Sequence, residues 1–169
     1  MISHVDKRVG NIIQTLKDNG LYENTIIIFA GDNGLAVGQH GLMGKQNVYE
    51  HSVGVPLMIK AAAQHTGKKT ADLCYLIDVF PTLCDMLQLP VPQSVDGISL
   101  LSSLDGKEPV RDYLYYSYMD NQRGISDGTW KLIEYHVNGK RTTQLFNLKN
   151  DPWERNDLSG QKKYEKTIQ

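Results

Sequence analysis

Residues 24–34 read NTIIIFAGDNG, and this stretch decides the fold. Residues 26–30 form a continuous apolar run without polar alternation, which predicts a strand buried on both faces of a parallel sheet. Asp32 and Asn33 follow at the carboxyl end of that strand, where ligands bind in open α/β sheets. A carboxylate beside a carboxamide offers hard oxygen ligands, so we predict that Asp32 and Asn33 bind a divalent cation such as calcium or magnesium.

Asp-Asn-Gly is also a common turn sequence, and the alternative interpretation is that it only reverses the chain. A hairpin turn would be followed by a matching strand. Residues 35–44 instead carry three glycines and show no alternation. We therefore predict a long functional loop over residues 35–54.

The predicted loop carries two further candidates, His40 and Lys45. An imidazole can protonate a leaving group, and a compact ammonium can neutralise an anionic ester oxygen. A single His or Lys on a loop is more often a solvated surface residue. It is the clustering of both residues with Asp32 and Asn33 that makes them site candidates.

The flanking segments predict an α/β fold. Apolar residues near the N-terminus recur at helical period, which predicts a helix that starts at a capping box of Ser3 and Asp6 and ends at Gly20. Residues 55–60 predict a second buried strand, and residues 78–89 predict a helix capped by the aspartate at its start. A helix that leads into a buried strand is half of a βαβ unit.

The C-terminal part has a different pattern. Residues 111–148 contain aromatic-rich or alternating segments separated by the turn sequences NQRG, SDG and NGK, which predict a small antiparallel meander. Loops are predicted over residues 61–70 and 90–106. The tail after Asp151 begins with turn chemistry, is predicted to be charged and solvated, and leaves room for a terminal helix.

Composition excludes several classes of function. The chain has 18 Lys and Arg against 19 Asp and Glu, so it lacks the basic excess of a nucleic-acid binder. Its apolar runs fall far short of the ~20 residues that span a bilayer, and its N-terminus has no features of a secretory signal. Cys74 and Cys84 are too few for a disulfide framework and lie among apolar residues, so we predict core thiols and not nucleophiles.

Most of the chain resembles the sulfatase family of the alkaline-phosphatase-like superfamily. The resemblance rests on VDKRVGNIIQTLKDNGLYENTIIIFAGDNGLAVGQHGLMGKQNVYEHSVGVPLMIK at residues 5–60, LIDVFPTLCDMLQLPVPQSVDGISL at 76–100, ISDGTWKLIEY at 125–135 and QLFNLKNDPWERNDL at 144–158. It implies the C-terminal part of an alkaline-phosphatase-like α/β sandwich, followed by a small antiparallel sheet subdomain. The implied division is residues 1–105 for the α/β part and residues 106–169 for the sheet and tail.

The resemblance also implies residue roles. Asp32 and Asn33 match the acidic and amide pair that ligates one divalent metal, usually Ca²⁺, in sulfatases. Lys45 matches the lysine that contacts the sulfate group, and His40 matches a position that often lies near the substrate. The implied substrate is a sulfate ester, either a sulfated sugar or an aryl sulfate, with no nucleic acid and no membrane as partner.

The family's nucleophile motif, C/S-x-P/A-x-R, does not occur in this sequence. Sulfatases make formylglycine from its first residue, which lies in their N-terminal half. Asp32 and Asn33 would also supply two protein ligands where calcium typically takes six to eight oxygens. We therefore expect a C-terminal fragment of a sulfatase that, alone, neither hydrolyses sulfate esters nor binds calcium tightly.

Two other functions remain open at this stage. The parent could be a phosphoester or phosphonate hydrolase, or a phosphoryl transferase, of the same superfamily, and the upstream nucleophile would decide between these chemistries. Alternatively, the chain could be a non-catalytic binding or packing module whose Gly-rich loop is only a connector. The joint presence of Asp32, Asn33 and Lys45 argues against the module.

Two expectations concern the setting of the chain. Residues 26–29 would have an unpaired apolar edge in a fragment, so we expect self-association. Sulfatases that the chain resembles are commonly periplasmic, secreted or lysosomal, which is the compartment that the resemblance implies for the parent.

Overall fold

The computed structural model describes residues 1–61 and 67–169, so the predicted connection over residues 61–70 lies partly outside the described residues. The chain forms two compact units, and each is described by itself. The first unit comprises Met1–Ala30 and Leu57–Lys68, and the second comprises Gly31–Pro56 and Lys69–Gln169. The division at residues 105 and 106 stays a prediction.

Helix α1 (Ile2–Asp18) opens the first unit. Its N-cap is Met1, two residues before the predicted Ser3, and it has no side-chain cap, so the predicted capping box of Ser3 and Asp6 is wrong. Its predicted end is confirmed, because Gly20 adopts a φ of 67° and its N–H donates to the carbonyl of Lys17. A residue with positive φ just past the last turn is a common way to satisfy the final carbonyls of a helix.

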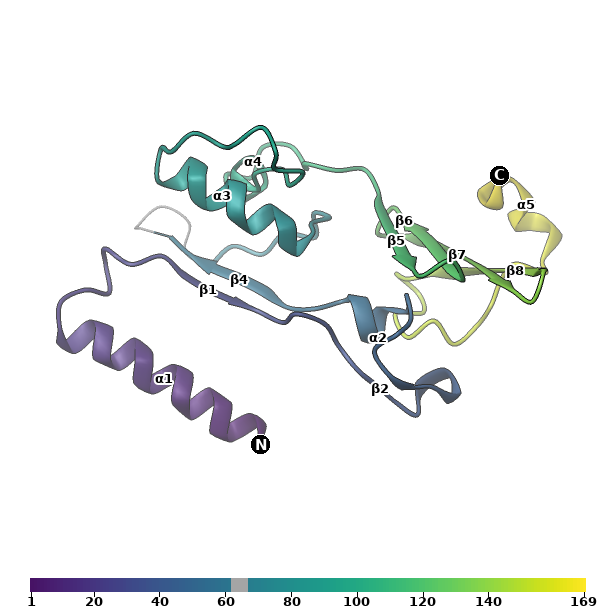
Figure 1. Cartoon of the computed structure of the whole chain (residues 1–169), viewed down its shortest axis with the longest axis horizontal. Helices are drawn as coiled ribbons and strands as arrows, with labels where there is room; N and C mark the ends of the chain where they lie inside the picture. The colour runs from purple at the N-terminus through teal and green to yellow at the C-terminus, as the bar shows by residue number, and fades with distance from the viewer. Residues whose placement is uncertain (62–66) are drawn as a thin grey trace. The chain divides into compact units, whose positions relative to one another are not determined.

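Strands β1 (Ile27–Ala30) and β4 (Leu57–Lys60) confirm the two predicted strands of the first unit (Figure 1). They pair with each other in antiparallel register, from Ile27 opposite Lys60 to Ala30 opposite Leu57. The prediction of parallel neighbours and of burial on both faces is therefore wrong for these strands as they stand. In the described ranges β1 pairs only with β4, so the second edge of β1 has no partner strand.

The Gly-rich segment of the second unit is more ordered than the predicted loop. It contains a hairpin of β2 (Ala36–Val37) and β3 (Met43–Gly44), with a 3-10 turn at Gln39–Gly41 between them and helix α2 (Glu50–Val53) after them. Gly38, His40 and Gly41 have φ of 111°, 54° and 70°, and these conformations let the chain reverse within a few residues. Strands β2 and β3 have two residues each, which is too short for an alternation of polar and apolar residues to be visible in the sequence.

Helix α3 (Val79–Met86) follows a 3-10 turn at Leu76–Asp78 and ends before the predicted Leu89. Asp78 is the N-cap residue of α3 as predicted, but its side chain makes no cap hydrogen bond to that helix. Its fully buried carboxylate accepts hydrogen bonds from the backbone N–H of Tyr75 and of Ile98, and from Arg111 at 2.7 Å. This carboxylate therefore joins three segments that are distant in sequence.

Helix α4 (Leu101–Leu104) lies in the stretch that was predicted to be a loop. It is a single turn, too short to leave a helical period in the sequence. Both cysteines are free thiols, Cys84 buried and Cys74 half-buried. Burial raises the pKa of the Cys74 thiol, which agrees with the prediction that it is no nucleophile.

The predicted meander is confirmed as a four-stranded antiparallel sheet with strand order β5-β6-β7-β8 (Figure 1). The strands are β5 (Leu114–Tyr118), β6 (Gln122–Ser126), β7 (Trp130–Val137) and β8 (Lys140–Asn147). The turn prediction for NQRG is wrong, because Gln122 already pairs with Tyr118 in β6. Asn138 and Gly139 both have positive φ, as a two-residue hairpin turn requires.

One face of this sheet packs against the Gly-rich segment and forms the core of the second unit. Val48 and Tyr49 from that segment contact Ile133 of β7 and Phe146 of β8, and all four are at most 6% exposed. The core thus lies between the sheet and residues 48–49, which closely follow the segment that carries the site candidates.

The tail is only partly solvated. The turn at Asp151 is confirmed by a hydrogen bond from the Glu154 N–H to its carbonyl, but the Glu154 side chain is only 2% exposed. The prediction of a solvated charged tail is therefore wrong at Glu154. A 3-10 turn at Lys162–Tyr164 and helix α5 (Glu165–Ile168) end the chain, and within residues 1–61 and 67–169 no helix is long and apolar enough to cross a membrane.

Candidate functional site

The Asp-Asn-Gly turn directly follows β1. Asp32 is exposed and Asn33 is half-buried, and the Asn33 N–H donates to Asp32 Oδ1 at 2.8 Å. This bond holds the carboxylate beside the start of the next peptide, and no donor among residues 1–61 and 67–169 bonds to Oδ2. The two side chains present hard oxygen atoms side by side, which suits a share of a calcium or magnesium site.

The set of possible metal ligands at this turn is small. Among the residues that the structure describes, no group of three or more His, Cys, Asp and Glu side chains is placed to hold a metal ion. Calcium takes six to eight oxygens, so Asp32 and Asn33 fit as a minority of its ligands. The roles of both residues as metal ligands stay predictions.

Gly34 fixes the turn against helix α2. Its N–H donates to the carbonyl of Ser52 at 2.9 Å, and a Cβ at this position would lie 2.0 Å from the carbonyl oxygen of His51. Only glycine allows this close approach of two backbone segments. The turn that carries Asp32 and Asn33 is thereby tied to the end of the Gly-rich segment.

His40 is held by three neighbours. Its ring stacks on Tyr49 with centroids 3.9 Å apart and planes inclined by 6°, and its centroid lies 5.5 Å from that of His51. His40 Nε2 is 3.2 Å from the carbonyl oxygen of Trp153. Because a carbonyl oxygen can only accept, Nε2 carries the hydrogen in this contact, which leaves Nδ1 as the nitrogen available for chemistry.

Tyr49 is in turn fixed by the sheet. Its hydroxyl donates to Gln144 Oε1 at 2.7 Å, and its ring meets Phe146 edge-on with centroids 6.1 Å apart. The orientation of His40 therefore depends on a tyrosine and on a strand about a hundred residues later in the chain.

Lys45 is exposed at the end of β3. Within the described ranges its ammonium makes no hydrogen bond or ion pair, and only its backbone contacts the neighbouring Gln46 and Asn47. The structure therefore places Asp32, Asn33 and His40 near helix α2 through the contacts above, and it shows no contact between Lys45 and any of them. Its role in contacting sulfate stays a prediction.

A fully buried lysine joins the Gly-rich segment to the sheet and the tail. Lys131 Nζ lies 2.7 Å from Glu50 Oε1 and 3.1 Å from Glu154 Oε1, and 4.9 Å from the ring centroid of Tyr116. Glu154 Oε2 also accepts the backbone N–H of Glu50 at 2.6 Å. Burial raises the pKa of Glu154, against the opposing effect of the Lys131 charge.

The surroundings of His51 disfavour its protonated form. Desolvation lowers its pKa, and the nearby His40 and Lys131 lower it further. Its Nε2 is buried without a hydrogen-bond partner, so a proton there would be a buried donor with no acceptor. Positive charge on His51 is therefore disfavoured beside His40.

Five further residues of the site were not predicted from the sequence: Tyr49, Glu50, His51, Lys131 and Glu154. Glu50 and Glu154 lie inside the sequence stretches that carry the family resemblance. Nothing in those stretches indicates that the two glutamates contact each other in the folded chain. The one local signal was Lys131, which sits at an inward position of the alternating strand β7. A lysine at an inward position requires a buried partner.

Comparison with known proteins identifies the family. Residues 38–169 match the family described as "N-sulphoglucosamine sulphohydrolase, C-terminal". The chain belongs to the sulfatase family. The predicted family is thus confirmed, and the region of the family that the chain matches is the C-terminal one.

Two curated sulfatases show how much of a relative the chain covers. N-acetylglucosamine-6-O-sulfatase of Bacteroides thetaiotaomicron is 30% identical over 175 residues, which cover 96% of this chain and 31% of the relative. Choline-sulfatase of Rhizobium meliloti is 33% identical over 165 residues, which cover 94% of this chain and 31% of the relative. The sulfatase chain spans about a third of the length of these relatives.

Solved structures agree on the fold. Phosphonate monoester hydrolase of Agrobacterium radiobacter superimposes with a TM-score of 0.84 at 28% identity, over 99% of this chain and 37% of that one. A protein solved with its substrate D-glucosamine-2-N,6-O-disulfate superimposes with a TM-score of 0.80 at 28% identity, over 98% and 36%. The mixed α/β fold of this sulfatase chain is that of the C-terminal part of such enzymes.

Proposed function

We propose that this chain supplies part of the active site of a sulfuric ester hydrolase, and that it is inactive alone. The observation that carries the proposal is the joining of the Asp-Asn-Gly turn to an oriented His40 through helix α2, in a chain of the sulfatase family. Asp32 and Asn33 would hold a share of one Ca²⁺, and the rest of its ligands would come from outside residues 1–169. The metal, when bound, supplies positive charge that polarises the sulfate group.

The side chains of the segment have defined roles in this proposal. The Lys45 ammonium neutralises charge on a sulfate oxygen, and its exposed position leaves it free to do so. In its doubly protonated form His40 would give the Nδ1 proton to the leaving oxygen and keep the Nε2 hydrogen on the Trp153 carbonyl. The substrate class is a sulfated sugar or an aryl sulfate, and the parent acts in a periplasmic, secreted or lysosomal compartment.

Exchange of Lys45 in the longer protein that contains this chain tests the proposal. Lys45→Ala should lower kcat/KM for 4-nitrophenyl sulfate by about 100-fold or more, because one charged group that stabilises a transition state is worth that much. Lys149→Ala is the matched control, since Lys149 is also exposed and lies outside the site.

An unchanged rate in Lys45→Ala would contradict the proposal and would favour a non-catalytic module. The 169-residue chain should show no turnover in the same assay. Turnover by the chain alone would contradict its proposed inactivity.

A phosphonate or phosphate ester hydrolase is the second candidate function. The specific observation in its favour is the superposition on phosphonate monoester hydrolase with a TM-score of 0.84. Parallel assays of the longer protein with 4-nitrophenyl sulfate and 4-nitrophenyl phenylphosphonate separate the two. A higher kcat/KM for the phosphonate would replace the sulfatase proposal with this one.

A further inference from the structure

Glu154 belongs to the tail turn that contacts His40, but its own side chain is turned into the core. Glu154 is 2% exposed, whereas Trp153, the residue before it, is 65% exposed. Trp153 and Arg155, the two neighbours of Glu154, line a cavity of about 570 Å³ together with Gln39, His40 and His51. Glu154 is therefore the buried residue between two residues that border the space beside His40.

The backbone at Glu154 has a conformation that glutamate rarely adopts. Its φ is 53°, in the left-handed region, where residues other than glycine are uncommon and strained. His40, which contacts the Trp153 carbonyl through Nε2 at 3.2 Å, is in the same region with a φ of 54°. Glycine would fit residue 154 with less strain, so the glutamate side chain is the feature of this turn that requires a physical reason.

The Glu154 carboxylate bonds to the peptide next to the ring on which His40 stacks. Its Oε2 accepts the backbone N–H of Glu50 at 2.6 Å. This N–H belongs to the peptide bond between Tyr49 and Glu50, and the carbonyl that contacts His40 belongs to the peptide bond between Trp153 and Glu154. One carboxylate therefore links the two backbone segments that hold His40.

Neutralisation of Lys131 does not by itself require Glu154. Lys131 Nζ already lies 2.7 Å from Glu50 Oε1, and one carboxylate balances the charge of one ammonium. Glu154 Oε1, at 3.1 Å from the same Nζ, is a second buried carboxylate, and its burial adds a cost of desolvation. The bond to the Glu50 N–H is what distinguishes Glu154 from a simple counter-ion.

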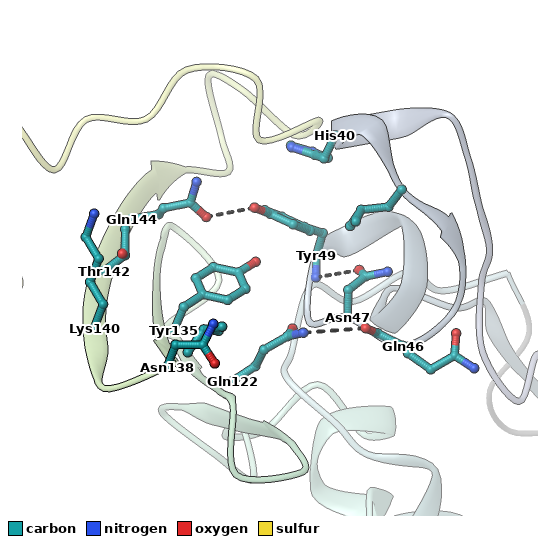
Figure 2. Close-up of a pocket in the computed structure, with 12 residues that line it drawn as sticks. His40, Gln46, Asn47, Tyr49, Gln122, Tyr135, Asn138, Lys140, Thr142 and Gln144 are labelled. Atoms are coloured by element: carbon teal, nitrogen blue, oxygen red, sulfur yellow. Dashed lines mark hydrogen bonds between the residues drawn. The ribbon is translucent and has the colours of Figure 1, made fainter.

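His40 is enclosed by two groups whose separation the carboxylate sets. The Tyr49 ring lies on one face of the imidazole with centroids 3.9 Å apart, and the Trp153 carbonyl meets Nε2 at its edge. Figure 2 shows the Tyr49 hydroxyl directed at Gln144 of the sheet, to which it donates, with His40 beside the tyrosine. Because the tyrosine is fixed by the sheet, a movement of the Trp153 carbonyl would turn the His40 ring and displace Nδ1.

We propose that Glu154 is a positioning residue for His40, which holds the Trp153 carbonyl against Nε2 and so directs Nδ1 at the leaving oxygen. The proposal rests on the proposed function for the acid step itself. In that step the S–O bond breaks, its electron pair goes to the leaving oxygen, and this oxygen takes the Nδ1 proton. Glu154 touches neither the substrate nor the reacting atoms, and it acts through the backbone of Trp153.

Three exchanges at Glu154 separate positioning from folding. Glu154→Gly removes the side chain, and glycine suits the φ of 53°. Glu154→Asp keeps the charge beside Lys131 but shortens the reach to the Glu50 N–H. Glu154→Gln keeps an acceptor for that N–H without the charge. Gln88→Gly is the matched control, because Gln88 is also a long polar residue with positive φ, 55°, at an exposed position.

NMR of the histidine ring protons in the 169-residue chain measures the position of His40. In the unmodified chain the ring current of Tyr49 should shift the His40 ring protons upfield, since the two rings are stacked. Glu154→Gly should remove most of this shift and Glu154→Asp a part of it. Glu154→Gln and Gln88→Gly should preserve it, and the signals of His4, on α1 of the first unit, should be the same in every variant.

Kinetics of the longer protein that contains this chain measure the consequence for the acid step. Phenol is a poorer leaving group than 4-nitrophenol, so phenyl sulfate depends more on a proton from His40. Glu154→Gly should lower kcat about tenfold or more for phenyl sulfate and about threefold or less for 4-nitrophenyl sulfate, with KM unchanged. Glu154→Gln should restore both rates to within about threefold of the unmodified protein. A general loss of folded protein would lower both rates equally.

Three results would overturn the proposal. They are unchanged His40 signals in Glu154→Gly and Glu154→Asp, the same change of signals in Gln88→Gly, or an equal loss of kcat for the two esters. If Glu154→Gly does not fold, the same measurements on Glu154→Asp decide the outcome. If the unmodified longer protein hydrolyses neither ester, the proposed function fails, whereas the His40 signals of the 169-residue chain still decide whether Glu154 positions the ring.

Discussion

At the scale of single residues, Lys131 is a fully buried charge that makes two ion pairs in the second unit. Its side chain is 0% exposed, and its ammonium lies between Glu50 and Glu154, which come from the Gly-rich segment and the tail. Removing a charge from water costs several kcal/mol, so such a group is tolerated only when it is closely paired. The pairing therefore determines where the Gly-rich segment meets the sheet.

Loss of this charge should be costly. Lys131→Met should lower the free energy of unfolding by about 3–5 kcal/mol, because it leaves Glu154 buried without its partner. Urea unfolding of the chain, followed by circular dichroism, measures the change. The double variant with Glu154→Gln should recover part of the loss, and Lys149→Met, at an exposed position, should change little.

A loss below about 1 kcal/mol in Lys131→Met would show that the ion pairs do not hold the Gly-rich segment against the sheet.

The sequence around Lys131, Glu50 and Glu154 gave little indication that these three residues form ion pairs. Asp32, Asn33, His40 and Lys45 stood out in the sequence because a carboxylate, an amide, an imidazole and an ammonium group follow the end of a predicted buried strand within one Gly-rich segment.

At the scale of elements, the sheet β5-β6-β7-β8 was predictable and the Gly-rich segment was not. Alternating and aromatic residues with Asn-Gly at a turn specify a hairpin locally, and β7 and β8 follow that pattern. Strand β6 was missed in part, because Gln122, Arg123 and Gly124 look like turn residues. They pair in a strand since their two neighbouring strands supply the hydrogen bonds.

Helix α2 shows why the Gly-rich segment could not be read locally. It has four residues, too few for a hydrophobic period, and it is held by its neighbours: Gly34 bonds to Ser52, and Glu50 bonds to Lys131 and Glu154. Its formation depends on contacts that span about a hundred residues.

The contact at Gly34 should be sensitive to a single methyl group. Gly34→Ala should destabilise the chain by about 1–3 kcal/mol, since the added Cβ would meet the His51 carbonyl oxygen. Thermal unfolding measures the effect. Gly160→Ala is the control, because a Cβ there has nothing within 4 Å. Equal stability of the two variants would refute the tight packing of the turn on α2.

At the scale of the whole molecule, the chain covers about a third of its curated relatives, and part of its apolar surface has no cover in residues 1–61 and 67–169. Phe29 and Met58 are directly opposite on the β1–β4 pair, and they are 39% and 58% exposed. An exposed apolar strand pair with a free edge is prone to intermolecular pairing.

The isolated chain should therefore self-associate. Size-exclusion chromatography with light scattering at rising concentration should show species larger than the 19.0 kDa chain, and Met58→Lys should shift them toward the monomer. Met119→Lys is the control, because Met119 is 69% exposed at a turn of the second unit. A monodisperse monomer at high concentration would contradict the expectation.

The sequence by itself indicated the family, the helices α1 and α3, the strands β1 and β4 and the C-terminal meander, and it supplied the candidates Asp32, Asn33, His40 and Lys45, whose roles stay predictions. Each of these rests on local pattern or on residues adjacent in the chain. Only the tertiary structure decided what surrounds them. The Tyr49 ring on His40, the burial of Lys131 between two glutamates and the contact of His40 with the Trp153 carbonyl depend on long-range pairing. Such contacts follow from the packing of the sheet on the Gly-rich segment, and no local pattern encodes which residues meet across it.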